Sequence, residues 1–111
     1  MKKERSSFTL VFGPTPIIKV IDFLLTFDSF DYSIAQISRE ISTKWESVES
    51  AIIFLLKKKI VKATRRVGKA QLYMLNKDSP ITKLLSEIDF KISKLFIEKE
   101  LAKQKKIAIS A

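Results

Sequence analysis

The spacing of apolar residues changes near Ile60, and that change restricts the folds open to this chain. Before it, over residues 16–56, apolar side chains recur every three or four positions, as on one face of an α-helix. After it, between Val61 and Leu75, they alternate with polar side chains, as along a β-strand. The order of the two periods predicts a group of helices followed by a β-hairpin.

Three helices are expected before the change, because each is preceded by a residue that can cap its free N–H groups. Thr15 precedes Pro16, whose missing N–H is not needed at the first helical position. The capping boxes pair Ser33 with Gln36 and Thr43 with Glu46. The predicted helices run from 16 to about 27, from 34 to about 41, and from 44 to the lysines at 57–59. The short gap between the last two predicts a helix-turn-helix.

The segments around these helices are expected to be extended. Residues 8–12, Phe-Thr-Leu-Val-Phe, predict a short strand or extended arm that ends at Gly13 and Pro14. The alternating stretch predicts a hairpin with its turn at Gly68, one of only two glycines in the chain. Lys59 stands where a glycine commonly ends a helix, so we expect that turn to lack the usual left-handed cap.

A long helix is expected after Ser79 and Pro80, which repeat the combination of a cap residue and a first-turn proline. Its apolar residues form a narrow stripe with charges between them. The expected stripe consists of Leu84, Leu85, Ile88, Ile92 and Leu95. A second copy of the same helix is the simplest cover, so we expect a homodimer. The predicted domains are a DNA-binding domain over 1–78 and a dimerisation helix and tail over 79–111.

The composition excludes several classes of site. The 111 residues fit one domain, and they include no Cys and no His. A structural zinc, a disulfide framework and the usual base of a catalytic triad are therefore missing. Asp28 and Asp31 lack a third ligand and are interpreted as solvated loop acids. We expect no enzyme activity, no cofactor and no small-molecule ligand, and, without a spanning segment or signal peptide, a cytoplasmic protein.

Positive charge is concentrated just after the third predicted helix. The net charge is +9, and residues 57–69 carry seven cations and no acid. Residues 6–56, in contrast, carry three cations and six acids. A local excess of this kind is typical of a surface that binds a polyanion such as DNA.

The order of three helices, hairpin and long helix resembles the winged helix-turn-helix superfamily, and in particular small archaeal transcription regulators. The matching stretches are FGPTPIIKVIDFLL, FDYSIAQISREI, the third helix and RRVGKAQLYMLNKDSPI. The resemblance implies a mainly α (α+β) fold with a two-stranded wing, the hairpin, and a long C-terminal dimerisation helix. It also implies that the third helix enters the major groove of double-stranded DNA while the wing contacts phosphates or the minor groove.

The residues expected to bind DNA follow from that arrangement. They are Lys44, Trp45, Ser47 and Ser50 at the front of the third helix, and Lys62, Arg65, Arg66 and Lys69 in the wing. Trp45 is equally compatible with packing against the second helix, and Lys57–Lys59 with a helix dipole. Glu49 in the third helix favours the alternative of a domain that docks on the transcription machinery. A non-specific DNA packaging protein is a further alternative to a sequence-specific regulator.

Overall fold

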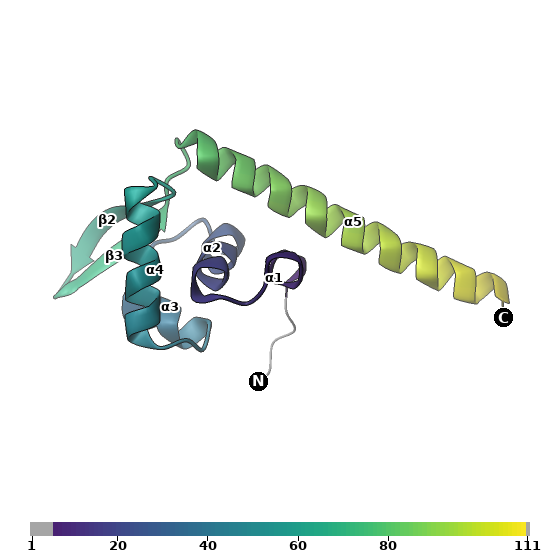
Figure 1. Cartoon of the computed structure of the whole chain (residues 1–111), viewed down its shortest axis with the longest axis horizontal. Coiled ribbons are helices and arrows are strands. Elements are labelled where there is room, and N and C mark those ends of the chain that lie inside the picture. Colours follow the sequence, from purple (N-terminus) through teal and green to yellow (C-terminus); the bar gives the residue numbers. More distant parts are fainter. Residues whose placement is uncertain (1–5, 111) are drawn as a thin grey trace.

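The computed structural model describes the backbone of residues 6–110 and the side chains of residues 6–105. Five helices and a three-stranded antiparallel sheet follow one another along it (Figure 1). They are α1 (Ser7–Phe12), α2 (Pro16–Thr26), β1 (Tyr32–Ser33), α3 (Ile34–Glu40), α4 (Trp45–Lys57), β2 (Val61–Val67), β3 (Ala70–Leu75) and α5 (Pro80–Ser110).

The core lies between α1, α2, α3, α4 and the base of the hairpin. Its fully buried members include Phe8, Val20, Leu24, Ile37, Val48, Ile52, Leu55 and Val61. The helical stripes predicted for α2, α3 and α4 therefore face one another, as their three- and four-residue spacing indicated. The cap of α2 is confirmed, since the Thr15 side chain accepts a hydrogen bond from the Ile18 N–H. The Ser33–Gln36 box of α3 is also confirmed, because both of its hydrogen bonds form.

The prediction of a strand over 8–12 is wrong: residues 7–12 form helix α1. Ser6 caps it by accepting a hydrogen bond from the Thr9 N–H at 3.2 Å. Phe8 is 1% exposed within the core, and the Ser7 and Ser93 hydroxyl groups are hydrogen-bonded at 3.1 Å, which joins α1 to α5. The packing of residues 7–12 against distant parts of the chain thus outweighs the β propensity of this segment.

The sheet contains one strand that the sequence analysis did not include. The hairpin of β2 and β3 is confirmed, with Gly68 at φ +62° in its turn. The two-residue strand β1 adds to it, since Tyr32 pairs with Tyr73 and Ser33 with Leu72, in the order β1-β3-β2. The hairpin is thereby fixed at its base to the loop that precedes α3.

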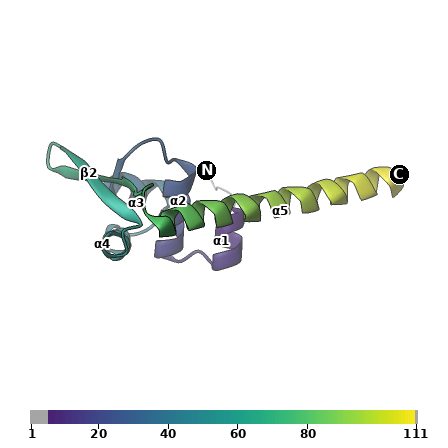
Figure 2. The same ribbon diagram turned by 90° about the horizontal axis from the view of Figure 1, so that it is seen from above.

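Only the first half of α5 packs on the rest of the chain. Thr82 is buried, and its hydroxyl donates to the Ile60 carbonyl at 3.2 Å. Every described side chain from Lys94 to Lys105 is exposed. Both views show this half of α5 projecting away from the other elements (Figures 1 and 2). None of the described helices combines the length and the apolar character that crossing a bilayer requires.

Candidate nucleic-acid interface

The turn between α3 and α4 fixes the position of α4. Ser42 adopts φ +51°, and the Thr43 N–H donates to the Ser38 carbonyl at 3.1 Å. The Ser38 hydroxyl donates to the Thr43 carbonyl in return. The Lys19 ammonium, from α2, donates to the Ile41 carbonyl at 3.4 Å and to the Thr43 hydroxyl at 3.3 Å. The predicted helix-turn-helix is thus held by side chains from within the turn and from α2.

The outward face of α4 contains part of the predicted set and adds residues to it. One face is buried through Val48, Ala51, Ile52 and Leu55. At 100° per residue, the opposite face is formed by Glu46, Ser50, Ile53 and Lys57, all exposed. Of the predicted residues, Ser50 lies on this face, Ser47 is half-buried beside it, and Lys44 and Trp45 are exposed at the start of the helix.

The capping box predicted for this helix is wrong. Lys44 occupies the N-cap position and makes no capping hydrogen bond with its side chain, and Thr43 bonds within the preceding turn instead. Glu46 therefore does not close a box, and its exposed side chain belongs to the outward face. The period of the buried residues in α4 identifies Glu46, Ile53 and Lys57 as outward residues, a signal that the sequence analysis did not use.

The end of α4 forms the left-handed cap that we did not expect. Lys59 adopts φ +61°, although it is not glycine. The Lys59 N–H donates to the Leu56 carbonyl at 3.1 Å, and the Ile60 N–H to the Leu55 carbonyl at 3.0 Å. This pair of bonds is a Schellman motif. It satisfies two carbonyl groups of the last turn and directs the chain into β2.

The wing carries exposed cations on β2 and at its tip. Lys62, Arg66 and Lys69 are exposed, and none of them forms an ion pair within the part of the chain that is described. The strand register shifts between Ala63 and Arg66, which bends the hairpin at this point. Together with Lys57, Lys58 and Lys59, these residues extend the positive charge from the end of α4 to the wing tip.

Arg65, the remaining predicted cation of the wing, forms an ion pair with Asp31. Its guanidinium donates to both carboxylate oxygens of Asp31, at 3.0 and 3.1 Å, and the Thr64 hydroxyl donates to Asp31 at 2.6 Å. These hydrogen bonds, those from Arg65 first, lower the pKa of Asp31 to about 2. Asp31 is therefore not a solvated loop acid, and Arg65 joins the wing to the loop before β1. The other acid of that loop, Asp28, lies 3.6 Å from the Lys77 ammonium.

The predicted dimer stripe on α5 is divided between two environments. Leu85 and Ile92 are half-buried, and Leu85 packs against the core of its own chain. Leu84, Ile88 and Leu95 are 57%, 41% and 63% exposed. Further exposed apolar residues, absent from the prediction, are Leu10, Val11 and Phe12 on α1 and Phe90, Ile97 and Leu101 on α5.

Two partly buried carboxyl groups interact electrostatically between α2 and α5. Burial raises the pKa of Asp22, while a hydrogen bond from Ser6 opposes this rise. Burial raises the pKa of Asp89 as well, and the negative charge of Asp22 adds to it. Each of these carboxyl groups is therefore easier to protonate than an exposed aspartate.

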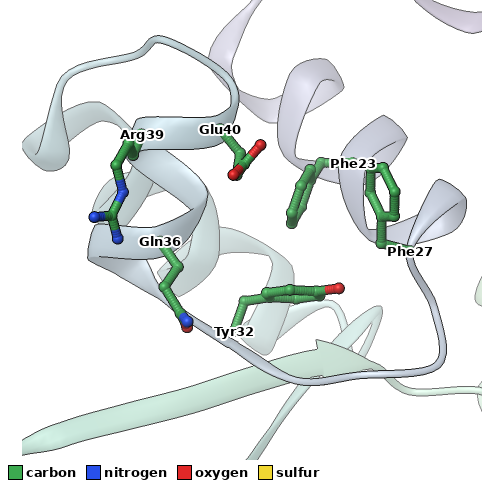
Figure 3. Close-up of a pocket in the computed structure, with 6 residues that line it drawn as sticks. All are labelled: Phe23, Phe27, Tyr32, Gln36, Arg39 and Glu40. Carbon is green, nitrogen blue, oxygen red and sulfur yellow. The ribbon is translucent and has the colours of Figure 1, made fainter.

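A hollow of about 290 Å³ lies where α2, β1 and α3 meet. It is lined by Phe23, Phe27, Tyr32, Gln36, Arg39 and Glu40. The ring of Phe23 contacts those of Phe27 and Tyr32, with centroids 5.1 and 4.9 Å apart. In Figure 3 the Glu40 carboxylate lies on the side of these rings, whereas Arg39 points away from them. Gln36 is engaged in the cap of α3, so much of this lining holds α2, β1 and α3 together. Across the described residues, no group of three or more candidate ligands could hold a metal ion.

Comparisons with known proteins show the fold. No family model and no curated protein matches the sequence. Among solved structures, the C30AH42A mutant of Lactococcus lactis ZitR in apo form is 18% identical, with a TM-score of 0.60 over 91% of this chain and 80% of that one. Streptococcus pneumoniae FabT in complex with DNA is 15% identical, with a TM-score of 0.62 over 86% of this chain and 65% of that one.

The description of a third similar structure states its fold. The homodimeric winged helix-turn-helix DNA-binding domain of Mb0332 from Mycobacterium bovis is 14% identical, with a TM-score of 0.58 over 84% of this chain and 81% of that one. It is described as a possible ArsR-family transcriptional regulator. At these identities the likeness concerns the fold alone. The chain is a mainly helical winged helix-turn-helix with a small antiparallel sheet and a long C-terminal helix.

Proposed function

We propose that this chain is a transcription regulator that binds double-stranded DNA as a homodimer. The observation that carries the proposal is the exposed positive charge that continues from the end of α4 through the wing, beside a solvent-facing helix of a helix-turn-helix. Such a surface is suited to a helix in the major groove with cations on the flanking phosphates. A protein of the same fold, FabT, has been seen in complex with DNA, which supports the proposal.

The proposed roles follow the exposure of each residue. The front of α4, with Lys44, Trp45, Ser47 and Ser50, lies in the major groove. Lys62, Arg66 and Lys69 contact phosphates, where each cation contributes by releasing counterions. Arg65 holds the wing through Asp31, and in this role it sets the direction of the wing instead of reading DNA.

The proposed dimer uses the apolar surface of α5 and α1. The exposed half of α5 carries large apolar side chains that the described part of its own chain leaves uncovered. An apolar surface of this extent is an aggregation hazard unless a partner covers it. Leu84, Ile88 and Leu95 are therefore assigned to the interface, with the exposed residues of α1 beside them. Mb0332 is homodimeric with the same fold, which supports this assignment.

The charge of the wing provides the test. Replacing Lys62, Arg66 and Lys69 with Ala removes three proposed phosphate contacts per protomer. We expect the slope of log K against log salt concentration to fall by about 3 per protomer, since each contact contributes roughly 0.9. The matched control replaces Lys83, Lys94 and Lys105, which carry the same charge on exposed positions of α5. Fluorescence anisotropy with genomic duplexes measures both, and equal slopes for the two triple variants would contradict the proposal.

A second candidate function is docking on a protein of the transcription machinery. The exposed Trp45 and the acid Glu46 on α4 favour it, because DNA repels a carboxylate and most of its surface is polar. Binding to no duplex at low salt would select this function. A packaging protein, in contrast, would bind all duplexes with equal affinity, whereas a regulator enriches particular sequences from a random pool.

A further inference from the structure

Two large apolar side chains lie exposed on the part of α4 that faces solvent. Ile53 is 47% exposed and Phe54 is 44% exposed, although α4 buries four other residues in the core. Ile53 stands on the outward face between Ser50 and Lys57. Phe54 lines an open groove of about 570 Å³, whose other wall contains Thr15, Pro16 and Ile17 from the start of α2.

This apolar pair lies far from the projecting half of α5, which is assigned to dimerisation. The projecting half of α5 and α4 lie at opposite ends of the molecule (Figure 1). Both residues stay nearly half exposed within the described part of the chain, and α4 is not among the elements assigned to the dimer interface. The pair is therefore free to make an apolar contact with the partner that α4 meets.

We propose that Ile53 and Phe54 contact the 5-methyl groups of thymines in the major groove, an inference that rests on the proposed function. Among the base-pair edges in that groove, thymine alone presents an apolar group, while the other positions are hydrogen-bond donors and acceptors. An apolar side chain against those donors and acceptors would leave them unsatisfied. Ile53 and Phe54 thus select thymine at the base pairs they reach.

The charges nearest to Ile53 and Phe54 favour DNA over a protein as their partner, since the acid of this face, Glu46, lies about two turns before Ile53. Lys57 follows Ile53 on the same face by one helical turn. The Lys58 ammonium lies 5.4 Å from the centroid of the Phe54 ring. In a duplex, a thymine methyl is likewise flanked by the phosphates at the groove edge. An apolar ring with lysines beside it is complementary to this arrangement.

The experiment removes only the methyl group. Binding sites are first selected from random duplexes of about 30 base pairs, which hold two half-sites one helical turn apart. The selected duplex is then synthesised with uracil in place of each recurring thymine, since uracil lacks the methyl and keeps the same hydrogen-bonding atoms. We expect affinity by anisotropy to fall about fourfold for each methyl removed, the ratio for burying one apolar group of this size.

Variants of the protein identify the contact. Ile53→Ala and Phe54→Ala should weaken binding to the thymine duplex and bring the ratio of thymine to uracil affinity towards one. Circular dichroism confirms that each variant is folded, as expected for half-exposed positions. Phe30→Ala is the matched control, because Phe30 is 68% exposed in the loop before β1 and should leave the ratio unchanged.

The outcomes separate this inference from the proposed function. Equal affinity of the wild type for thymine and uracil duplexes overturns the inference and leaves specific DNA binding intact. A ratio of thymine to uracil affinity that stays at the wild-type value in both alanine variants also overturns the inference. Wild-type affinity for the thymine duplex in both variants overturns it as well, and would assign this face to a protein partner. Failure of the folded wild type to bind any duplex overturns the proposed function as well.

Discussion

Replacing Lys59 with glycine should stabilise the protein. Lys59 adopts φ +61° in the Schellman motif at the end of α4, where a side chain is strained. The left-handed conformation costs a non-glycine residue about 1–2 kcal/mol. Glycine avoids this cost but loses roughly 0.5–1 kcal/mol through the greater freedom of its unfolded chain. The expected net gain is about 0.5–1 kcal/mol, which corresponds to a rise in Tm of about 2–8 °C.

Lys58→Gly is the control for the loss of charge. Lys58 is the neighbouring C-cap residue, at φ −85° and ψ −1° in the right-handed helical region, where glycine has no advantage. It also places its ammonium over the Phe54 ring. We expect this variant to lose about 1 kcal/mol. Thermal unfolding followed by circular dichroism, at one fixed protein concentration, compares the two variants. A change of Tm in the same direction in both variants would show that the lost charge, and not the backbone conformation at Lys59, controls the change in stability.

Further predictions concern the wing, the acids and the dimer. Asp31 has a folded pKa of about 2 against 3.8, so its pairing with Arg65 stabilises the fold above pH 3.8 and is lost as the pH falls towards 2. Asp31→Asn should therefore lower Tm at neutral pH but not near pH 2, and Arg65, once released, should make DNA binding more salt-dependent. Asp89 has a raised pKa, so its charge opposes folding at neutral pH and this cost vanishes below pH 3.8. Asp89→Asn should raise Tm at neutral pH and leave it unchanged at about pH 3, whereas a gain at both would exclude the charge as its cause. Ile88→Lys with Leu95→Lys should give helical monomers in sedimentation whose DNA affinity is at least tenfold weaker by order of magnitude, and a wild type that is already monomeric would refute the interface.

The elements that the sequence predicted correctly are those whose determinants lie within a few residues of one another. Thr15 and Pro16 begin α2, and Ser33 and Gln36 begin α3, because a cap acts on N–H groups two or three positions away. Gly68 marks the hairpin turn for the same reason, since its φ is a property of one residue. The long helix after Pro80 follows from a periodicity that needs no knowledge of other segments. The basic wing could also be predicted from the sequence, because its cations lie close together along the chain.

Tertiary structure decided what depends on residues far apart in the chain. Phe8 lies in a β-prone segment, yet its burial in the core and the contact of α1 with α5 make that segment a helix. Arg65 reads as one of several free cations until the fold brings Asp31, 34 residues away, against it. Lys59 accepts a left-handed backbone because the path from α4 into β2 requires it. A contact of this kind is set by which surfaces the packing brings together, and local spacing carries no information about that.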